Sequence, residues 1–285
     1  MAFSLTAFGS VRWNGNGFEG TDPTTTDVLG PFYRPGAPMR HQLVPAGSKG
    51  IPMHLSGTVF KPDGKTPLAG TLIEVWQCDE HEVYDNTSDD YKFRGACKTG
   101  SDGKYYFDTI VPVPYKAGPT SWRPAHIHFR VSSPEYQDLI TQIYFKGDSH
   151  LEEDAGSAAA DAQHRILEMV KNTKGIQAVK FDIRIQKQFK LDSASLKKIT
   201  GLYQLKDGTV EFLQEDDLLF MKQNGQLTEA MLYKGDNTFE GGMGYIKAKF
   251  NFLASSTEVV ISMGDFDGKD VSKITSIKGE RFLKY

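Results

Sequence analysis

Short runs of β-branched, aromatic and alternating residues recur along the first two thirds of this 285-residue chain. They lie at residues 55–60, 71–77, 104–108, 126–132 and 139–145. Turn-forming sequences rich in Pro, Gly and Asp lie at residues 61–65 and 100–103. Because side chains alternate between the two faces of a strand, and because these turn residues reverse the chain, the pattern predicts an all-β fold.

One helix is expected within this part of the chain. Residues 158–171 place Ile166, Leu167 and Val170 at helical spacing, and Gly175 follows as a stop signal. Residues 176–185 then alternate again, so we expect them to form a closing strand.

The chain changes character after a polar, aperiodic stretch at residues 187–198. From residue 201 on, turn dipeptides such as Asp207-Gly208 recur at a spacing of roughly ten residues, which is typical of antiparallel hairpins. This spacing predicts a small barrel or sandwich of about eight strands. We therefore expect an N-terminal arm at residues 1–23, a first β domain at 24–188 and a β-rich accessory domain at 189–285, whose role the sequence does not assign.

Composition and charge argue against several classes of partner. The net charge of −3 gives no electrostatic case for nucleic acid or for an anionic membrane. No run approaches the ~18 apolar residues of a membrane span, and no signal peptide is visible at the start, which favours a cytoplasmic location with export as the alternative. Cys78 and Cys97 are too few for a disulfide scaffold, so we expect two small, half-buried residues, and whether they pair stays open.

Two histidines stand two residues apart in the sequence Trp-Arg-Pro-Ala-His-Ile-His-Phe at residues 122–129. In a strand, His126 and His128 point to the same face while Ile127 points into the opposite layer. Two neutral imidazoles on one face form half of a transition-metal site. The pair alone is weak evidence, because such pairs also occur as hydrogen-bonded polar groups in half-buried strands.

Two tyrosines are candidates for the other half of the site. Tyr84 follows the strand that ends in Trp76-Gln77, and Tyr115 lies in a proline-stiffened loop before the histidine strand. Because a phenol has a pKa near ~10, only a strongly Lewis-acidic ion holds it as phenolate at neutral pH. Two phenolates and two imidazoles suit a trivalent ion such as ferric iron better than zinc or calcium.

The order of these sequences resembles the intradiol ring-cleavage dioxygenases, over about residues 24–188. The matching segments are residues 29–38, 57–60, 74–77, 93–95, 99–105, 122–129 and 141–145. The resemblance implies a transthyretin-like β-sandwich with one helix. It also implies an enzyme of aromatic hydrocarbon catabolism that uses O2 to cleave a catechol-type ring between the two hydroxylated carbons, giving a muconate-type diacid.

The resemblance also implies the site residues. A non-haem Fe(III) would be bound by Tyr84, Tyr115, His126 and His128. Tyr115 would serve as both ligand and base, and Arg123 and Gln142 would line the substrate pocket as catalytic residues. The family usually has Gly two residues before the first tyrosine ligand, and this chain has Glu82 there, so we expect altered turn geometry rather than a lost ligand.

The sequence leaves the substrate open among catechol, a carboxylated catechol and a trihydroxybenzene. The lack of a helical region before Thr24 favours a compact, protocatechuate-type relative, and homo-oligomers are compatible with the sequence. Two alternatives stay open: a non-catalytic transthyretin-like binding module, which needs neither the His pair nor both tyrosines, and a zinc hydrolase, which lacks a suitably placed carboxylate or thiol.

Overall fold

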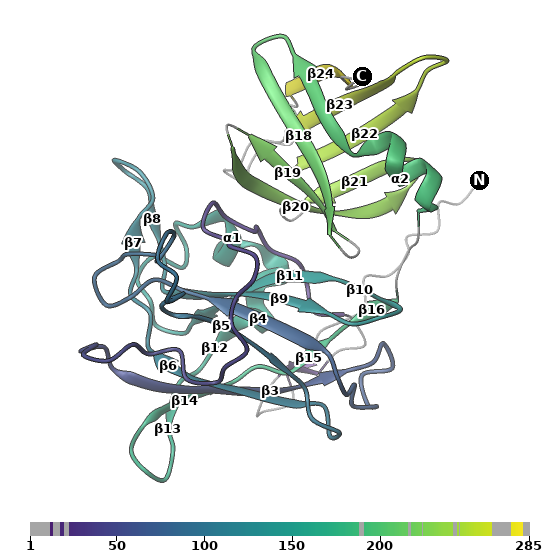
Figure 1. Cartoon of the computed structure of the whole chain (residues 1–285). Coiled ribbons are helices and arrows are strands. Elements are labelled where there is room, and N and C mark those ends of the chain that lie inside the picture. The colour runs from purple at the N-terminus through teal and green to yellow at the C-terminus, as the bar shows by residue number, and fades with distance from the viewer. Residues whose placement is uncertain are drawn as a thin grey trace.

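The computed structural model describes residues 12–13, 18–19, 23–187, 191–215, 218–223, 225–241, 244, 246–263 and 275–281. Within these residues the chain forms a β-sandwich and, above it, a β-barrel (Figure 1). The all-β fold predicted from the sequence is confirmed. Most of the expected N-terminal arm lies outside the described residues, apart from a short antiparallel pair, β1 (Arg12–Trp13) and β2 (Phe18–Glu19).

The sandwich consists of two five-stranded sheets. The first has the order β12 (Ile166–Leu167), β11 (Leu139–Phe145), β9 (His126–Ser132), β4 (Leu72–Trp76) and β5 (Arg94–Lys98). The second contains β13 (Val170–Lys171), β14 (Gln177–Lys180), β3 (Pro52–Phe60) and β15 (Ile183–Arg184), with β6 (Lys104–Ile110) paired to β3. The sequence predicted both β9 and β11 with their observed bounds.

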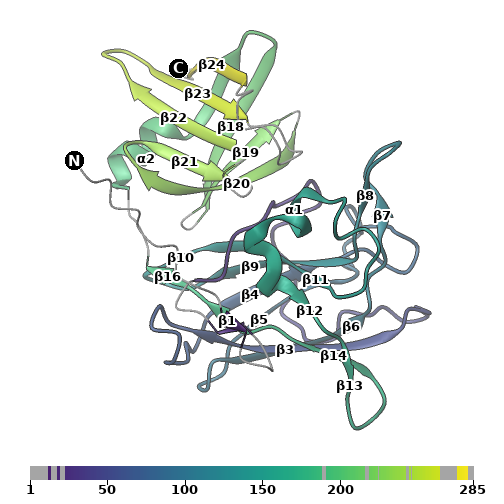
Figure 2. The ribbon, with the colours of Figure 1, turned by 180° about the vertical axis from the view of Figure 1, so that it is seen from behind.

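Strand β9 is buried on both faces along its whole length. Ile127, Phe129 and Val131 enter the core between the two sheets. Side chains of the alternate residues, His126 and His128, therefore point to the other face of the first sheet. Figures 1 and 2 show that this face is the one on which the barrel lies, whereas β3 lies on the far side.

The helix expected at residues 158–171 is wrong. The structure has a shorter helix that begins earlier, α1 (Ala155–Ala158), followed by a 3-10 turn, η1 (Ala160–Arg165), and then by β12 and β13. Asp154 starts α1 because its side chain accepts a hydrogen bond from the Ser157 N–H. Ile166 and its neighbour pair in parallel with β11, so sheet pairing overrides their helical spacing.

The expected closing strand at residues 176–185 is present as two pieces, β14 and β15, which both pair in parallel with β3. Gly175 does not stop a helix. It has a positive φ of 75° and lies in the turn between β13 and β14, where its N–H donates to the Asn172 carbonyl.

A second helix, α2 (Ser193–Ile199), overlaps the stretch at residues 187–198 for which the sequence indicated no periodicity. Asp192 caps its first turn by accepting from the Ser195 N–H at 2.9 Å and the Ser195 hydroxyl at 2.7 Å. Ile199 at the end of α2 is fully buried in the core of the barrel. The helix is therefore anchored to the barrel. The Asp192 cap is a sequence signal that could have predicted this helix, whereas the hydrophobic pattern did not indicate it.

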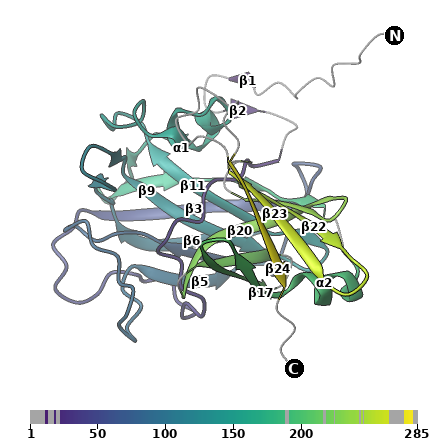
Figure 3. The same ribbon diagram turned by 90° about the horizontal axis from the view of Figure 1, so that it is seen from above.

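The barrel is closed and antiparallel, with eight strands, as the turn spacing predicted. They are β17 (Gly201–Leu205), β18 (Gly208–Glu215), β19 (Leu218–Gln223), β20 (Gln226–Gly235), β21 (Thr238–Gly241), β22 (Ile246–Phe252), β23 (Thr257–Met263) and β24 (Thr275–Arg281). Aromatic rings fill the interior, and Phe250 makes edge contacts with Phe212 at 5.0 Å and Phe239 at 5.8 Å. Seen from above, the barrel covers part of the sandwich (Figure 3).

Cys78 and Cys97 are free and buried. Burial raises the pKa of the Cys78 thiol to about 11, so it stays protonated and unreactive at neutral pH. In the part of the chain that the structure describes, no helix is long and apolar enough to cross a membrane.

We predict that Asp192→Ala destabilises the barrel, because the substitution removes the cap of α2. Loss of such a cap costs about 1 kcal/mol. The free energy of unfolding from urea denaturation, followed by circular dichroism, measures this cost. Asp192→Asn is the control, since it retains an accepting side-chain oxygen. If the alanine variant is as stable as the parent protein, α2 does not depend on this cap.

Candidate active site

Four ring side chains meet on the face of the first sheet that points toward the barrel. His126 and His128 come from β9, Tyr84 from the loop after β4, and Tyr115 from β7 (Tyr115–Lys116). All four are buried, with exposed fractions between 1% and 8%. The structure thus brings together the four residues that the sequence analysis named as metal ligands.

The distances among these rings are short. The ring centroids of His126 and His128 lie 4.8 Å apart, and that of Tyr115 lies 5.5 Å from that of His126. The hydroxyl of Tyr84 lies 3.2 Å from Nε2 of His126. The polar ends of these four side chains, two hydroxyl groups and two imidazoles, therefore converge on one small volume.

Both imidazoles are neutral. Burial, assisted by the positive charge of Arg123, lowers the pKa of His126 well below its usual value of 6.5. Burial and the neighbouring His126 do the same for His128. Nδ1 of His126 lies 2.6 Å from the Pro124 carbonyl oxygen, which assigns the ring proton to Nδ1 and leaves a lone pair on Nε2.

Both phenols hold their protons when no cation is bound. Burial and the neighbouring Tyr115 raise the pKa of Tyr84 well above 10. Burial also raises the pKa of Tyr115, although the charge of Arg123 opposes this shift. Ionising two such phenols at neutral pH requires a strongly Lewis-acidic cation.

This donor set fits ferric iron. Two neutral imidazoles and two phenolates would balance most of the charge of a trivalent ion, and they would offer it hard phenolate oxygens together with the imidazole nitrogens that suit iron. Among the described residues, no group of three or more His, Cys, Asp or Glu side chains is arranged to hold a metal ion. The side chains that lie beside the His pair in the ring cluster are phenols, whereas a zinc hydrolase requires carboxylates or thiols.

Tyr84 is positioned by a tight turn at residues 79–83. Oδ1 of Asp79 accepts from the N–H groups of His81 at 2.8 Å and Val83 at 2.9 Å. Glu82 has a φ of 68°, in the left-handed region that glycine adopts most readily. The turn keeps a glycine-like backbone at Glu82, and Tyr84 lies within the ring cluster, so this departure from the family pattern does not displace the tyrosine.

Arg123 and Gln142, the two remaining predicted site residues, are in contact beside the rings. Arg123 lies on β8 (Trp122–Arg123), opposite Tyr115 of β7, and its Nη2 donates to Oε1 of Gln142 at 2.8 Å. Gln142 lies on β11 opposite His128. The pairing of β7 with β8 and of β9 with β11 therefore places both side chains next to the ring cluster.

The guanidinium of Arg123 is held by an ion pair with Asp154. Nε lies 2.5 Å from Oδ1, without the N–H alignment of a hydrogen bond. Burial lowers the pKa of Arg123, but nearby Tyr144 and Asp154 outweigh this and raise it above its usual value. Arg123 is therefore a permanent, nearly buried positive charge at the site.

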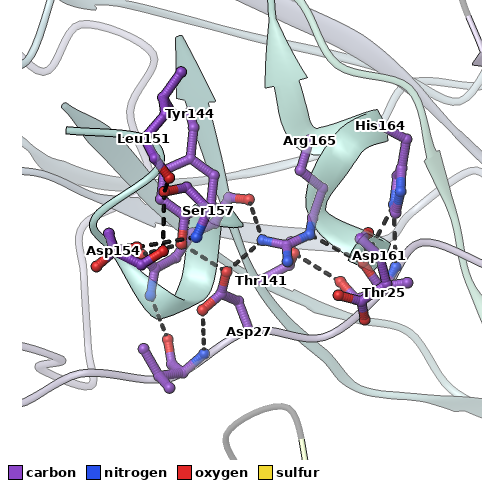
Figure 4. Close-up of polar contacts among 12 residues, drawn as sticks. Thr25, Asp27, Thr141, Tyr144, Leu151, Asp154, Ser157, Asp161, His164 and Arg165 are labelled. Carbon is purple, nitrogen blue, oxygen red and sulfur yellow. Dashed lines mark hydrogen bonds and ion pairs between the residues drawn. The ribbon is translucent and has the colours of Figure 1, made fainter. Parts of the chain in front are cut away.

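The sequence analysis missed the polar network that supports Gln142. Asp27 and Arg165 form a fully buried ion pair, and the hydroxyl of Tyr144 donates to Oδ2 of Asp27 at 2.8 Å (Figure 4). Arg165 also donates to the Gln142 carbonyl at 3.1 Å. No local pattern signals this pair, because the two residues are 138 positions apart in the chain.

The proline-rich segment, residues 29–38, closes another side of the site. Gly30 has a φ of 72°, and a Cβ there would lie 3.1 Å from Cε1 and 3.7 Å from Nε2 of His128, so the backbone lies close against this edge of the ring. Phe32 stacks on Tyr84 with a ring distance of 4.4 Å. The segment therefore contacts two of the four rings.

Comparison with known proteins finds 1,2-dioxygenases among the relatives of this chain. Residues 28–187 match a protein-family model described as dioxygenase. A chlorocatechol 1,2-dioxygenase of Rhodococcus opacus is 39% identical over 158 residues, which cover 47% of this chain and 61% of the relative. A 6-chlorohydroxyquinol 1,2-dioxygenase of Cupriavidus pinatubonensis (strain JMP 134 / LMG 1197) is 36% identical over 180 residues, which cover 57% of this chain and 63% of the relative. The chain thus spans slightly less than two thirds of the length of these curated relatives.

Solved structures agree. Catechol 1,2-dioxygenase from Pseudomonas arvilla C-1 superposes with a TM-score of 0.53 at 27% identity, covering 60% of this chain and 64% of that protein. The dioxygenase domain of a dioxygenase and carbohydrate-binding protein fusion from Streptomyces sp. SirexAA-E superposes with a TM-score of 0.50 at 32% identity, covering 58% of this chain and 99% of that domain. Since the family match extends over more than half of its residues, the chain belongs to the intradiol ring-cleavage dioxygenase family.

Proposed function

We propose that this protein is an iron-dependent intradiol dioxygenase, with residues 24–188 as its catalytic domain. In the proposed reaction, O2 adds across a catechol-type ring between the two hydroxylated carbons, and the product is a muconate-type diacid. The observation that carries the proposal is the buried convergence of two neutral imidazoles with two phenols. A non-catalytic binding module would need neither the His pair nor both tyrosines.

The proposed ligands of the iron are Tyr84, Tyr115, His126 and His128. When bound, Fe(III) supplies the Lewis acidity that ionises both phenols and the redox centre for chemistry between the substrate and O2. His126 would coordinate through Nε2, because its Nδ1 faces the Pro124 carbonyl.

We assign the role of base to Tyr115 rather than Tyr84. Tyr115 lies on the short edge strand β7, directly opposite Arg123, whose charge favours the phenolate. Tyr84 is more deeply held, between Phe32 and the His126 ring nitrogen. The phenolate of Tyr115 would accept a proton from an incoming catechol hydroxyl.

Arg123 and Gln142 have different proposed roles. The charge of Arg123 would stabilise negative charge that develops on the ring of the substrate during cleavage. Both ends of the Gln142 amide are engaged by protein groups, since Oε1 accepts from Arg123 and Nε2 donates to the Val28 carbonyl at 2.7 Å. We therefore propose that Gln142 positions Arg123, in place of a direct hydrogen bond to substrate oxygen.

For the substrate, we propose a catechol without a carboxylate. The named relatives act on catechol, chlorocatechol or chlorohydroxyquinol rings, which points away from the protocatechuate type favoured by the sequence analysis. Two arginines lie beside the rings, and both are engaged by protein groups. Arg123 is paired with Asp154, and Arg94 donates to the Asp85 and Phe32 carbonyls, which leaves both poorly suited to bind a substrate carboxylate as well.

We predict that His128→Ala, and equally His126→Ala, lowers the iron content of the purified protein. Each substitution removes a nitrogen donor from a buried site that has only four ring donors. Metal analysis after loading with iron and desalting measures the effect. His54→Ala is the control, because His54 is partly exposed and pairs with Asp108 on β6. Equal iron contents in all three variants would contradict the assignment of ligands.

We predict that Tyr115→Phe lowers kcat by about 10²-fold or more, since it removes the proposed base while keeping the ring. The visible absorption of the iron-loaded protein should also change, because one of two phenolate donors is lost. Oxygen uptake with catechol and an absorption spectrum measure the two effects. Tyr106→Phe, at an exposed position on β6, should match the parent protein in both. Unchanged turnover in Tyr115→Phe would rule out its role as base.

We predict that Arg123→Gln lowers kcat by about 10²-fold while iron content stays at the parent level. Asp154→Asn should have a smaller effect of the same kind, because the guanidinium stays in place but loses its ion pair. Steady-state kinetics together with metal analysis separate these effects. A loss confined to KM would show that Arg123 binds substrate without stabilising the transition state.

A further inference from the structure

Two neighbouring strands of the barrel, β19 and β20, are apolar on both faces over part of their length. Leu219 and Met221 of β19 and Met231 of β20 point into the barrel core. Their neighbours Leu218, Phe220, Ala230 and Leu232 point outward and are nevertheless buried. We call these four residues the outer patch. They lie side by side, because Leu218 pairs with Leu232 and Phe220 pairs with Ala230.

The outer patch is covered by the catalytic domain. It belongs to one cluster of buried residues together with Leu29, Tyr33, Trp76 and Ile140, and with both tyrosines of the ring cluster. Figures 1 and 2 show β19 and β20 on the side of the barrel nearest to β9 and β11. The barrel therefore packs against the wall of the candidate active site.

Within this interface, aromatic rings form a continuous column. Phe220 stacks on Tyr33 with centroids 5.7 Å apart and an angle of 7°. Tyr33 contacts Trp76 at 5.0 Å, and Trp76 stacks on His128 at 4.8 Å and 6°. The column thus joins a residue of the barrel to a proposed iron ligand.

Polar contacts hold the column in place. Arg130 donates to the Tyr33 hydroxyl at 2.9 Å and pairs with Asp138 at 3.1 Å and with Glu215 of β18 at 3.3 Å. Nε2 of Gln226 on β20 donates to the Pro31 carbonyl at 3.1 Å. The barrel therefore contacts the proline-rich segment on both sides of Phe32.

The two histidines differ in how their rings are oriented. His126 has a hydrogen bond from Nδ1 to the Pro124 carbonyl, as metal-binding histidines usually do. Nδ1 of His128 is buried and has no hydrogen-bond partner among the described residues. The orientation of His128 therefore depends on packing, namely on Trp76 on one face and on the backbone at Gly30.

We propose that Phe220 of the barrel is a positioning residue for the catalytic site, which orients His128 through Tyr33 and Trp76. This inference rests on the proposed function, since it takes His128 as an iron ligand. The accessory domain would thereby have a role in the reaction. Ring packing, in place of a hydrogen bond at Nδ1, would hold His128 in its orientation, and the barrel supplies the outermost ring of this column. Loosening the column would leave His128 free to rotate away from the iron.

The test uses the full-length protein loaded with iron. In Phe220→Ala, iron should be released to a chelator about three- to tenfold faster than in the parent protein, in keeping with the loss of one aromatic stack. The visible absorption band should shift, and the tryptophan fluorescence of the metal-free protein, to which Trp76 contributes together with Trp13 and Trp122, should change. Phe220→Leu, which keeps an apolar side chain without a ring, should behave like the alanine variant, and Phe220→Tyr should restore parental values.

Leu232→Ala is the matched control, because it shortens another side chain of the outer patch that lies outside the ring column. Its iron release and absorption band should equal those of the parent protein. Suppose that the parent protein binds iron and cleaves catechol, but that Phe220→Ala and Phe220→Leu have the same iron release and absorption band as Leu232→Ala. The inference is then overturned, and the proposed function stands. If the parent protein itself takes up no iron and opens no catechol, the proposed function fails and the inference with it.

Discussion

The two-residue alternation of β9 is the constraint on which the rest of the structure depends. Ile127 and Phe129 fix the strand in the sandwich core, so the intervening side chains, His126 and His128, must point to the opposite face. A slip of one residue in register would exchange the two sets and bury the imidazoles among apolar side chains. The packing of the sandwich thereby sets the geometry of the site.

The surroundings of β9 then determine the protonation state of the two imidazoles, and with it their ability to bind a metal ion. Burial keeps them neutral, so that their ring nitrogens can donate to a metal ion, and it keeps the nearby phenols protonated, so that only a strongly Lewis-acidic ion can displace the phenol protons. One fully buried ion pair, Asp27 with Arg165, ties the segment that precedes the sandwich strands to β11 and to Gln142. Removal of one partner of such a pair lowers the free energy of unfolding by about 3–5 kcal/mol, because the other charge is left buried and uncompensated, so the pair holds this part of the structure firmly in place.

Much of the fold and of the candidate site could be predicted from sequence, because local sequence patterns determine it. Alternation defines β9 and β11, turn dipeptides define the eight-stranded barrel, and the order of short motifs points to the four ring donors. The helix expected at residues 158–171 failed because edge pairing with β11 outweighs helical spacing. The pair of Asp27 and Arg165, and the docking of Phe220 on Tyr33, arise from contacts between distant parts of the chain that no local pattern encodes.

Product analysis with labelled oxygen tests most directly whether this site carries out intradiol cleavage. The iron-loaded protein is incubated with catechol under ¹⁸O2, and the product is identified by mass spectrometry. We expect a six-carbon diacid opened between the two hydroxylated carbons, with one labelled oxygen atom in each carboxyl group. A product opened at a neighbouring bond, or a diacid without label, would contradict the mechanism proposed for Tyr84, Tyr115, His126 and His128.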